Sequence, residues 1–121
     1  MLFRSSTFDD FLEPAADASH TLYASPAIAT SHEVVRIDTG TPLFMRAPGE
    51  ATGSIALESA IDEMAQACDM DPLAFRLKNY ANAEPISGKP FSSKALRECY
   101  AKGAEKFGWS KRPLQPRQMR D

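Results

Sequence analysis

The chain has 121 residues and a mass of 13.3 kDa, which suits one small domain with a modest core. Hydrophobic residues make up 43% and charged residues 25% of the sequence, the balance of an ordinary soluble globular protein. No stretch approaches the ~20 consecutive apolar residues of a membrane helix, and the acidic N-terminus is not typical of a secretory signal. These features argue against a multidomain protein, a membrane span and a disulfide scaffold.

Charge is divided unevenly along the chain. Residues 1–63 carry three basic and ten acidic side chains, whereas residues 64–121 carry eleven basic and six acidic ones. A basic half can mark a nucleic-acid or phosphate surface. Here the basic residues are spread among acids, and no nucleic-acid motif accompanies them. We therefore interpret them as solvated helix faces and a basic tail, and we expect neither a nucleic-acid partner nor membrane contact.

The first elements in chain order are two expected strands. Residues 1–19 are irregular, whereas residues 20–25 and 29–38 are rich in β-branched and aromatic side chains and are bounded by Pro26 and Gly40. Two strands alone make only a marginal sheet. We expect further strands from other segments to complete it.

Three helices are expected to follow. The first carries an apolar stripe at helical spacing, formed by Leu57, Ile61, Met64, Ala65 and Cys68. Asp71 and Pro72 predict the start of the second helix, over 72–81, because Asp suits an N-cap and Pro suits the first helical position. The third begins near Ser92 or Ser93, and Gly108 fits the left-handed residue that follows a helix. Strands followed by three helices predict an α+β fold.

The cysteines and histidines give no sign of a metal site held by side chains. Cys68 and Cys99 fall in helical patterns without a CxxC motif, so we expect two reduced, buried thiols. His20 and His32 have no partner at ligand spacing. No order of Ser, His and Asp points to a catalytic triad.

The loop at 41–53, TPLFMRAPGEATG, is the most distinctive stretch. Gly49 and Gly53 can let a backbone approach a ligand closely, the following helix presents free N–H groups, and Arg46 adds a planar cationic donor. A purely structural loop fits the same composition. Glu50 suits the positive end of the helix dipole better than a catalytic role.

A family resemblance covers residues 8–121. In order, the chain has the arginine loop Met45–Glu50, the helix ALESAIDEMA with its acidic residues, and Asp71-Pro72 followed by Arg76 and Asn79. This set resembles the molybdenum-cofactor-binding large subunit of the xanthine dehydrogenase and aldehyde oxidoreductase family, the molybdenum hydroxylases. It is most similar to the bacterial periplasmic aldehyde oxidoreductase branch.

The resemblance implies a molybdenum–pterin cofactor, in many bacterial members the cytosine dinucleotide form, and oxidation of an aldehyde or N-heterocycle with oxygen from water. It implies iron–sulfur and FAD subunits as partners, besides the remaining segments of the large subunit. It places Met45, Arg46 and Ala47 beside the cofactor, without a metal-ligating side chain, and gives Asp71, Arg76 and Asn79 a structural role.

The resemblance also implies that the family's catalytic glutamate lies near the far C-terminus of the intact subunit. We therefore expect no catalytic residue in this sequence and no turnover by this chain alone. The sequence is interpreted as a fragment: one partial molybdopterin-binding domain over 1–121, with an extended part at 1–45, a loop and helices at 46–110 and a basic tail at 111–121. The expected compartment is the cytoplasm, or the periplasm through a partner subunit's signal. The alternative is a free-standing helical interaction module without catalysis.

Overall fold

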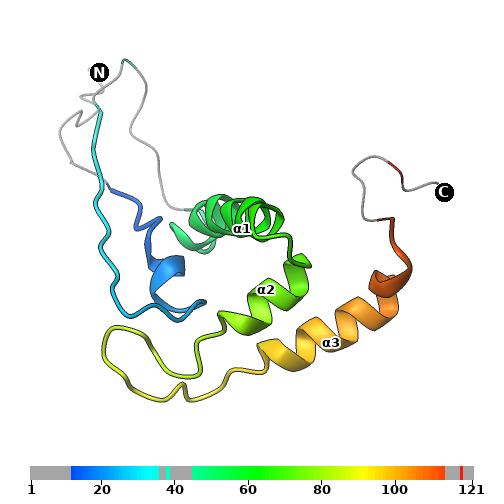
Figure 1. Ribbon diagram of the computed structural model, residues 1–121. Helices are drawn as coiled ribbons and strands as arrows, with labels where there is room; N and C mark the ends of the chain where they lie inside the picture. Colours follow the sequence, from blue (N-terminus) through cyan, green and yellow to red (C-terminus); the bar gives the residue numbers. More distant parts are fainter. Residues whose placement is uncertain (1–11, 36–37, 39–44, 114–117, 119–121) are drawn as a thin grey trace. The chain divides into compact units, whose positions relative to one another are not determined.

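The computed structural model describes residues 12–35, 38, 45–113 and 118, and the regular secondary structure of that part is helical (Figure 1). The elements follow the order η1 (Asp17–His20), α1 (Glu50–Ala67), α2 (Pro72–Lys78), α3 (Leu96–Phe107) and η2 (Trp109–Lys111), where η denotes a 3₁₀ helix. The chain divides into two compact units, Met1–Pro90 and Phe91–Asp121.

The predicted N-terminal strands are wrong for the described residues. Residues 17–20 form η1, and the only β-type contacts in the described part are isolated bridges between Tyr23 and Tyr80 and between Ala83 and Pro90. Residues 29–35 are exposed and belong to no strand, while 36 and 37 lie outside the description. Among the described residues, the β-branched sequence has no second strand with which to pair.

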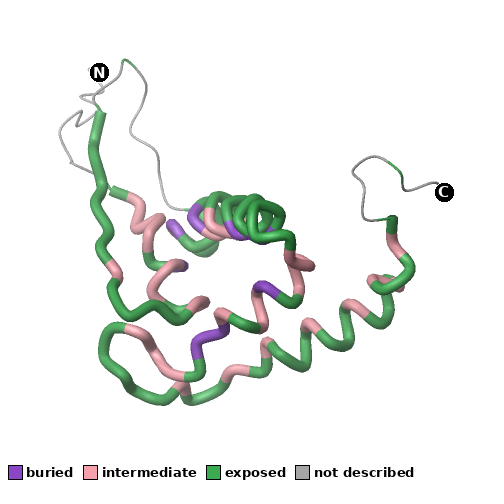
Figure 2. The backbone as a smooth tube through the Cα atoms, viewed as in Figure 1, coloured by how far each residue is buried: buried purple, intermediate pink, exposed green. Residues whose placement is uncertain are grey.

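The core of the first unit lies between α1 and α2. Ile61, Ala65 and Phe75 are its buried members (Figure 2). Partly buried hydrophobic side chains pack against them, namely Tyr23, Leu57 and Met70. The predicted stripe is therefore confirmed at Leu57, Ile61 and Ala65.

The rest of that stripe is wrong. Met64 is 52% exposed, and Cys68 is exposed as a free thiol. Cys99 is exposed too, so the prediction of two buried thiols is also wrong. The stripe is wider than the surface that the seven-residue α2 covers, which leaves its C-terminal edge in contact with solvent.

Helix α2 begins as predicted. The side chain of Asp71 accepts hydrogen bonds from the backbone N–H groups of Leu73 and Ala74, both at 2.9 Å, and Pro72 occupies the first turn. The helix ends at Lys78, three residues before the predicted end at 81. Beyond it the backbone pairs with the N-terminal segment, where Ala24 N–H donates to the carbonyl of Asn79 at 2.8 Å.

In the second unit, α3 starts at Leu96 and not at the predicted Ser92 or Ser93, and its N-cap Ala95 makes no side-chain capping bond. Gly108 adopts the left-handed conformation with φ 73°, as predicted. The Phe107 and Trp109 rings then lie 6.0 Å apart, and the Arg112 guanidinium lies 3.5 Å from the Trp109 ring centroid. No residue of α3 is buried.

Candidate functional site

The arginine loop forms an exposed turn that leads directly into α1. Met45 is 82% exposed and Arg46 is also exposed. Ala47 has φ 60°, a left-handed conformation that a residue with a Cβ seldom adopts. Gly49, with φ 73°, is the N-cap of α1. Residues 41–44, which precede this turn, lie outside the described part.

Hydrogen bonds join the turn to the helix. The N–H of Ala51 donates to the carbonyl of Ala47 at 3.2 Å, and the N–H of Gly53 donates to the carbonyl of Gly49 at 2.8 Å. Within the described part of the chain, the Arg46 guanidinium takes part in no hydrogen bond or ion pair. The turn therefore presents a cation at the positive end of an 18-residue helix.

Glu50 is exposed in the first turn of α1, the position at which a carboxylate stabilises the helix dipole. This placement agrees with the expected helix-end role and gives the carboxylate no buried partner among the described residues.

The two glycines of the loop leave room for another part of this chain and not for a ligand. A Cβ on Gly49 would lie 2.5 Å from the backbone of Pro14, and one on Gly53 would lie 1.9 Å from the carbonyl oxygen of Ala15. Both glycines are buried. The backbone that approaches them closely is this chain's own segment at 14–15, so these glycines do not open space for a ligand.

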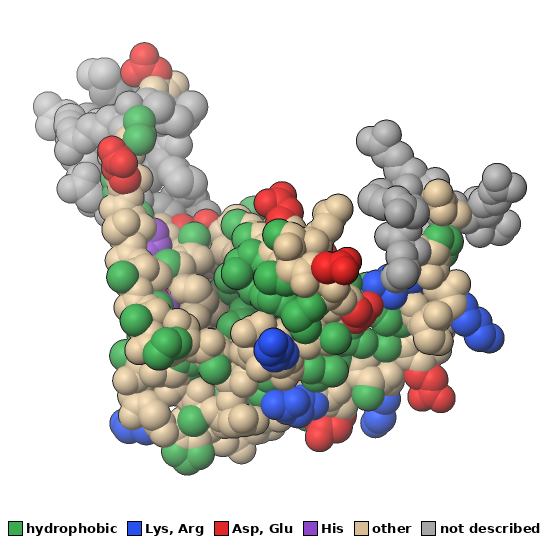
Figure 3. Space-filling view, in the orientation of Figure 1, with side chains coloured by type: hydrophobic (Ala, Val, Ile, Leu, Met, Phe, Trp, Pro, Cys, Tyr) green, Lys and Arg blue, Asp and Glu red, His purple; other side chains and the backbone are tan. Residues whose placement is uncertain are grey.

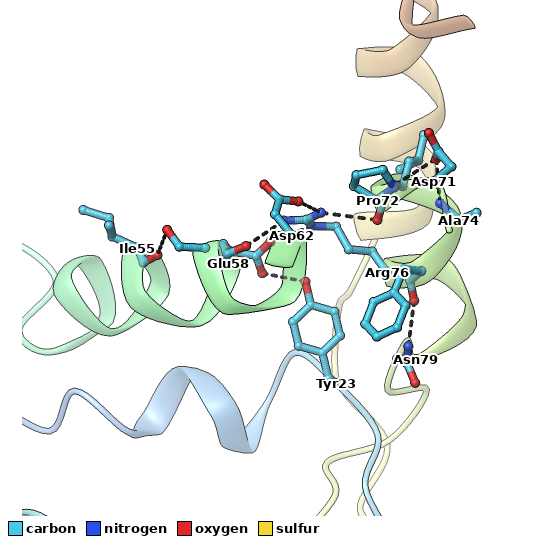
Figure 4. A network of polar contacts seen from close by, with 12 residues as sticks. Tyr23, Ile55, Glu58, Asp62, Asp71, Pro72, Ala74, Arg76 and Asn79 are labelled. Carbon is cyan, nitrogen blue, oxygen red and sulfur yellow. Dashed lines mark hydrogen bonds and ion pairs between the residues drawn. The ribbon is translucent and has the colours of Figure 1, made fainter. Parts of the chain in front are cut away.

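A polar network joins α2 to α1 (Figure 4). Arg76 Nε donates to Glu58 Oε2 at 2.7 Å, and an Arg76 terminal nitrogen donates to Asp62 Oδ1 at 2.6 Å. The other terminal nitrogen donates to the carbonyl of Glu58 at 3.1 Å, and the hydroxyl of Tyr23 donates to Glu58 Oε1 at 2.6 Å. Burial lowers the pKa of Arg76, but the hydrogen bonds and charges of Asp62 and Glu58 outweigh it and raise the pKa overall.

The structural interpretation is thereby confirmed for Asp71 and Arg76, whereas the Asn79 side chain bonds to its own helix. Asp71 caps α2, Arg76 holds the two helices together, and Asn79 Nδ2 donates to the carbonyl of Phe75 at 2.8 Å. The sequence analysis missed the partners of Arg76, because Glu58 and Asp62 sit on the polar side of the α1 pattern. Their i, i+4 spacing, which puts two carboxylates side by side, is the signal that could have found them.

The remaining titratable groups of the described part do not meet the needs of a metal centre. Among the described residues, no group of three or more His, Cys, Asp and Glu side chains could hold a metal ion. His20 Nε2 lies 3.2 Å from the hydroxyl oxygen of Thr30, and His32 Nε2 accepts the N–H of Ala16 at 3.4 Å. Both histidines thus have local partners.

Around the helix that follows Pro90, Figure 3 shows Lys and Arg side chains mixed with Asp and Glu side chains. Over the part of the chain that is described, no helix is long and apolar enough to cross a membrane.

Comparisons with known proteins show the family of the chain. Residues 5–80, which contain the arginine loop, α1 and α2, match the model of the molybdopterin cofactor-binding domain. The chain is 42% identical, over 110 residues and 90% of its length, to the aldehyde oxidoreductase molybdenum-binding subunit PaoC of Escherichia coli. It is 36% identical, over 94 residues and 75% of its length, to the putative xanthine dehydrogenase molybdenum-binding subunit XdhA of the same species.

The chain therefore belongs to the molybdopterin cofactor-binding domain family. Within it, the relatives are molybdenum-binding subunits of the aldehyde oxidoreductase and xanthine dehydrogenase group. The chain spans 15% of the length of the aldehyde oxidoreductase subunit and 12% of that of the xanthine dehydrogenase subunit.

Proposed function

We propose that this chain forms part of the molybdenum-binding subunit of an aldehyde-oxidising molybdenum hydroxylase, and that Met45, Arg46 and Ala47 line its cofactor site. The observation that carries the proposal is the exposed Arg46 guanidinium, without a partner among the described residues, at the start of α1 and inside the matched region. Aldehyde is preferred over an N-heterocycle because the aldehyde oxidoreductase subunit is 42% identical, against 36% for the xanthine dehydrogenase subunit.

The chemistry of the turn fits such a group. A guanidinium offers five N–H donors in one plane, which suits the oxo and phosphate oxygens of a molybdenum–pterin cofactor. The N-terminus of α1 adds a positive potential at the same place. The left-handed φ of Ala47 is the kind of backbone strain that persists when the surrounding structure requires it.

When bound, the cofactor supplies the redox chemistry by which oxygen from water is added to the substrate. The residues of this chain bind and orient it. The Arg46 guanidinium binds anionic oxygens at the turn, and α1 supports the turn. The Arg76 network keeps α1 in place against α2. We assign no catalytic residue to this chain, and Glu50 stays a helix-end charge.

The finer parts of the proposal follow from the family resemblance. The cofactor is proposed to be the cytosine dinucleotide form, and the partners to be iron–sulfur and FAD subunits together with the other large-subunit segments. Residues 1–121 are proposed to form one partial cofactor-binding domain, with 46–110 as its loop-and-helix part. Either the cytoplasm or the periplasm is compatible with these proposals.

The test is substitution of Arg46 in the assembled enzyme that contains this chain. Arg46→Ala removes the donors and Arg46→Lys keeps the charge without the planar fork, while Lys89→Ala, in an exposed loop, is the matched control for loss of a cation. Loss of one preorganised donor is expected to lower kcat for an aldehyde by about 10²–10³-fold.

Molybdenum content and the electron paramagnetic resonance signal of Mo(V) provide readouts besides activity. We expect both Arg46 variants to alter the Mo(V) signal and the control to leave it unchanged. Unaltered signal, metal content and turnover in Arg46→Ala would contradict the proposal and favour the free-standing interaction module. Faster oxidation of a purine than of an aldehyde by the unmodified enzyme would overturn the substrate assignment alone.

A further inference from the structure

From the close contact between α1 and the segment at 14–15, we infer that Gly53 and Gly49 are positioning residues for the cofactor turn at 45–47. This inference rests on the proposed function of that turn. Gly49 and Gly53 are four residues apart and therefore lie on one side of the helix start. On that side, the backbone of Pro14 and Ala15 takes the space that side chains would need.

The contact has little freedom to adjust, because both partners are backbone. A Cβ on Gly53 would lie 1.9 Å from the carbonyl oxygen of Ala15 and 2.8 Å from its carbonyl carbon. Real contacts of this type are longer than 3.0 Å, so the two segments would have to separate by about 1 Å. At Gly49 the same crowding is combined with a φ of 73°.

The segment at 14–15 is the better anchored of the two partners. The N–H of Asp17 donates to the carbonyl of Pro14 at 3.1 Å, and the N–H of Ala15 donates to the carbonyl of Glu13 at 2.8 Å. These bonds lead into η1, where Ala18 is only 2% exposed. The exposed turn at 45–48 lacks comparable burial. We therefore expect the clash made by a Cβ at Gly53 to be relieved mainly by movement of the start of α1, which carries Arg46 with it.

The experiment compares Gly53→Ala with Gly103→Ala in the assembled enzyme. Gly103 is the matched control, because it is also a helical glycine but a Cβ there meets nothing within 4 Å. Misplacement of a positioned group by about 1 Å can lower a rate by about 10²-fold. We expect Gly53→Ala to lower kcat by that order and to change the Mo(V) resonance signal, and Gly103→Ala to change neither.

Outcomes separate this inference from the proposed function. If Arg46→Lys alters the Mo(V) signal and Gly53→Ala does not, the turn serves the cofactor but Gly53 does not position it. If neither variant alters the signal, the proposed function itself fails. If Gly53→Ala lowers only the melting temperature and leaves the Mo(V) signal and kcat unchanged, Gly53 has a structural role only and the inference is overturned.

A second variant decides the question if Gly53→Ala does not assemble. The single O–H of Thr52 is shared between the carbonyl of Gly49, at 3.3 Å, and Glu13 Oε2, at 3.5 Å, so it links the helix start to the same N-terminal segment. Thr52→Val keeps the shape and removes both bonds. We expect a smaller change of the Mo(V) signal, and an unchanged signal would overturn the inference.

Discussion

Replacement of Arg76 by Ala removes the main polar link between α1 and α2. The side chain of Arg76 is only 12% exposed, and it donates to Glu58 Oε2 at 2.7 Å and to Asp62 Oδ1 at 2.6 Å. Two further bonds reach the carbonyls of Glu58 and Pro72, at 3.1 and 3.2 Å. Without the guanidinium, Glu58 keeps only the hydroxyl of Tyr23 among these partners.

The magnitude follows from how exposed each partner is. Breaking a fully buried ion pair costs about 3–5 kcal/mol, whereas an exposed pair is worth about 0–1 kcal/mol. The Glu58 side chain is 32% exposed and that of Asp62 is 59% exposed, so the pair with Glu58 carries most of the effect. We expect Arg76→Ala to lower the free energy of unfolding of the first unit by about 2–3 kcal/mol. Arg76→Lys, which keeps the charge but loses the fork geometry, should lower it by about 1–2 kcal/mol.

Urea unfolding followed by far-ultraviolet circular dichroism measures this change. Lys78→Ala is the control, because it removes a cation from the same helix at an exposed position. A surface substitution of this kind changes stability by no more than about 0.5 kcal/mol. If Arg76→Ala unfolds at the same urea concentration as Lys78→Ala, the network does not hold the two helices together.

Three further predictions concern caps and one carboxylate. Asp71→Ala removes the acceptor for two backbone N–H groups and should lower the free energy of unfolding by about 1 kcal/mol, measured by urea titration, while Asp71→Ser should retain most of it. Gly108→Ala places a side chain at φ 73° in open space, so it should shorten α3 at a cost of about 1 kcal/mol, seen as lost helical dichroism. The hydroxyl of Ser87 and the N–H groups of Ser87 and Ile86 lower the pKa of Glu84, so these bonds stabilise the loop above the ordinary carboxyl pKa and are lost as the pH falls through the lowered value. A loss of amide protection at Ile86 and Ser87 as the pH falls below the ordinary carboxyl pKa would show this, and pH-independent protection would contradict it.

Two local capping signals, at Asp71 and Gly108, were predicted because they depend on neighbouring residues only, whereas the predicted Ser92 or Ser93 cap of α3 was wrong. Asp71 followed by Pro72 starts α2, and Gly108 ends α3 in the left-handed conformation, as their side chains dictate. The partners of Glu58 and Asp62 could not be obtained in this way. Arg76 is 18 residues from Glu58 in the sequence, and only the packing of α2 on α1 brings the two together.

The strands and the glycines of the loop depend on tertiary contacts, which the sequence alone does not show. Val34 and Val35 favour a strand, but a strand exists only when another segment pairs with it, and no described residues do so. Gly49 and Gly53 correctly indicated a close backbone approach. The sequence could not say that the approaching backbone is Pro14–Ala15 and not a ligand, because that depends on tertiary contact.

The central claim is that the Arg46 guanidinium lies beside the molybdenum cofactor. Pulsed electron–nuclear resonance on the Mo(V) state of the assembled enzyme, prepared with ¹⁵N-labelled arginine, measures it most directly. We expect a weak ¹⁵N coupling that disappears in Arg46→Lys and persists in Arg112→Lys, because the Arg112 guanidinium stacks on Trp109. Spectra of labelled and unlabelled enzyme that show no ¹⁵N coupling, or a coupling that survives Arg46→Lys, would contradict it.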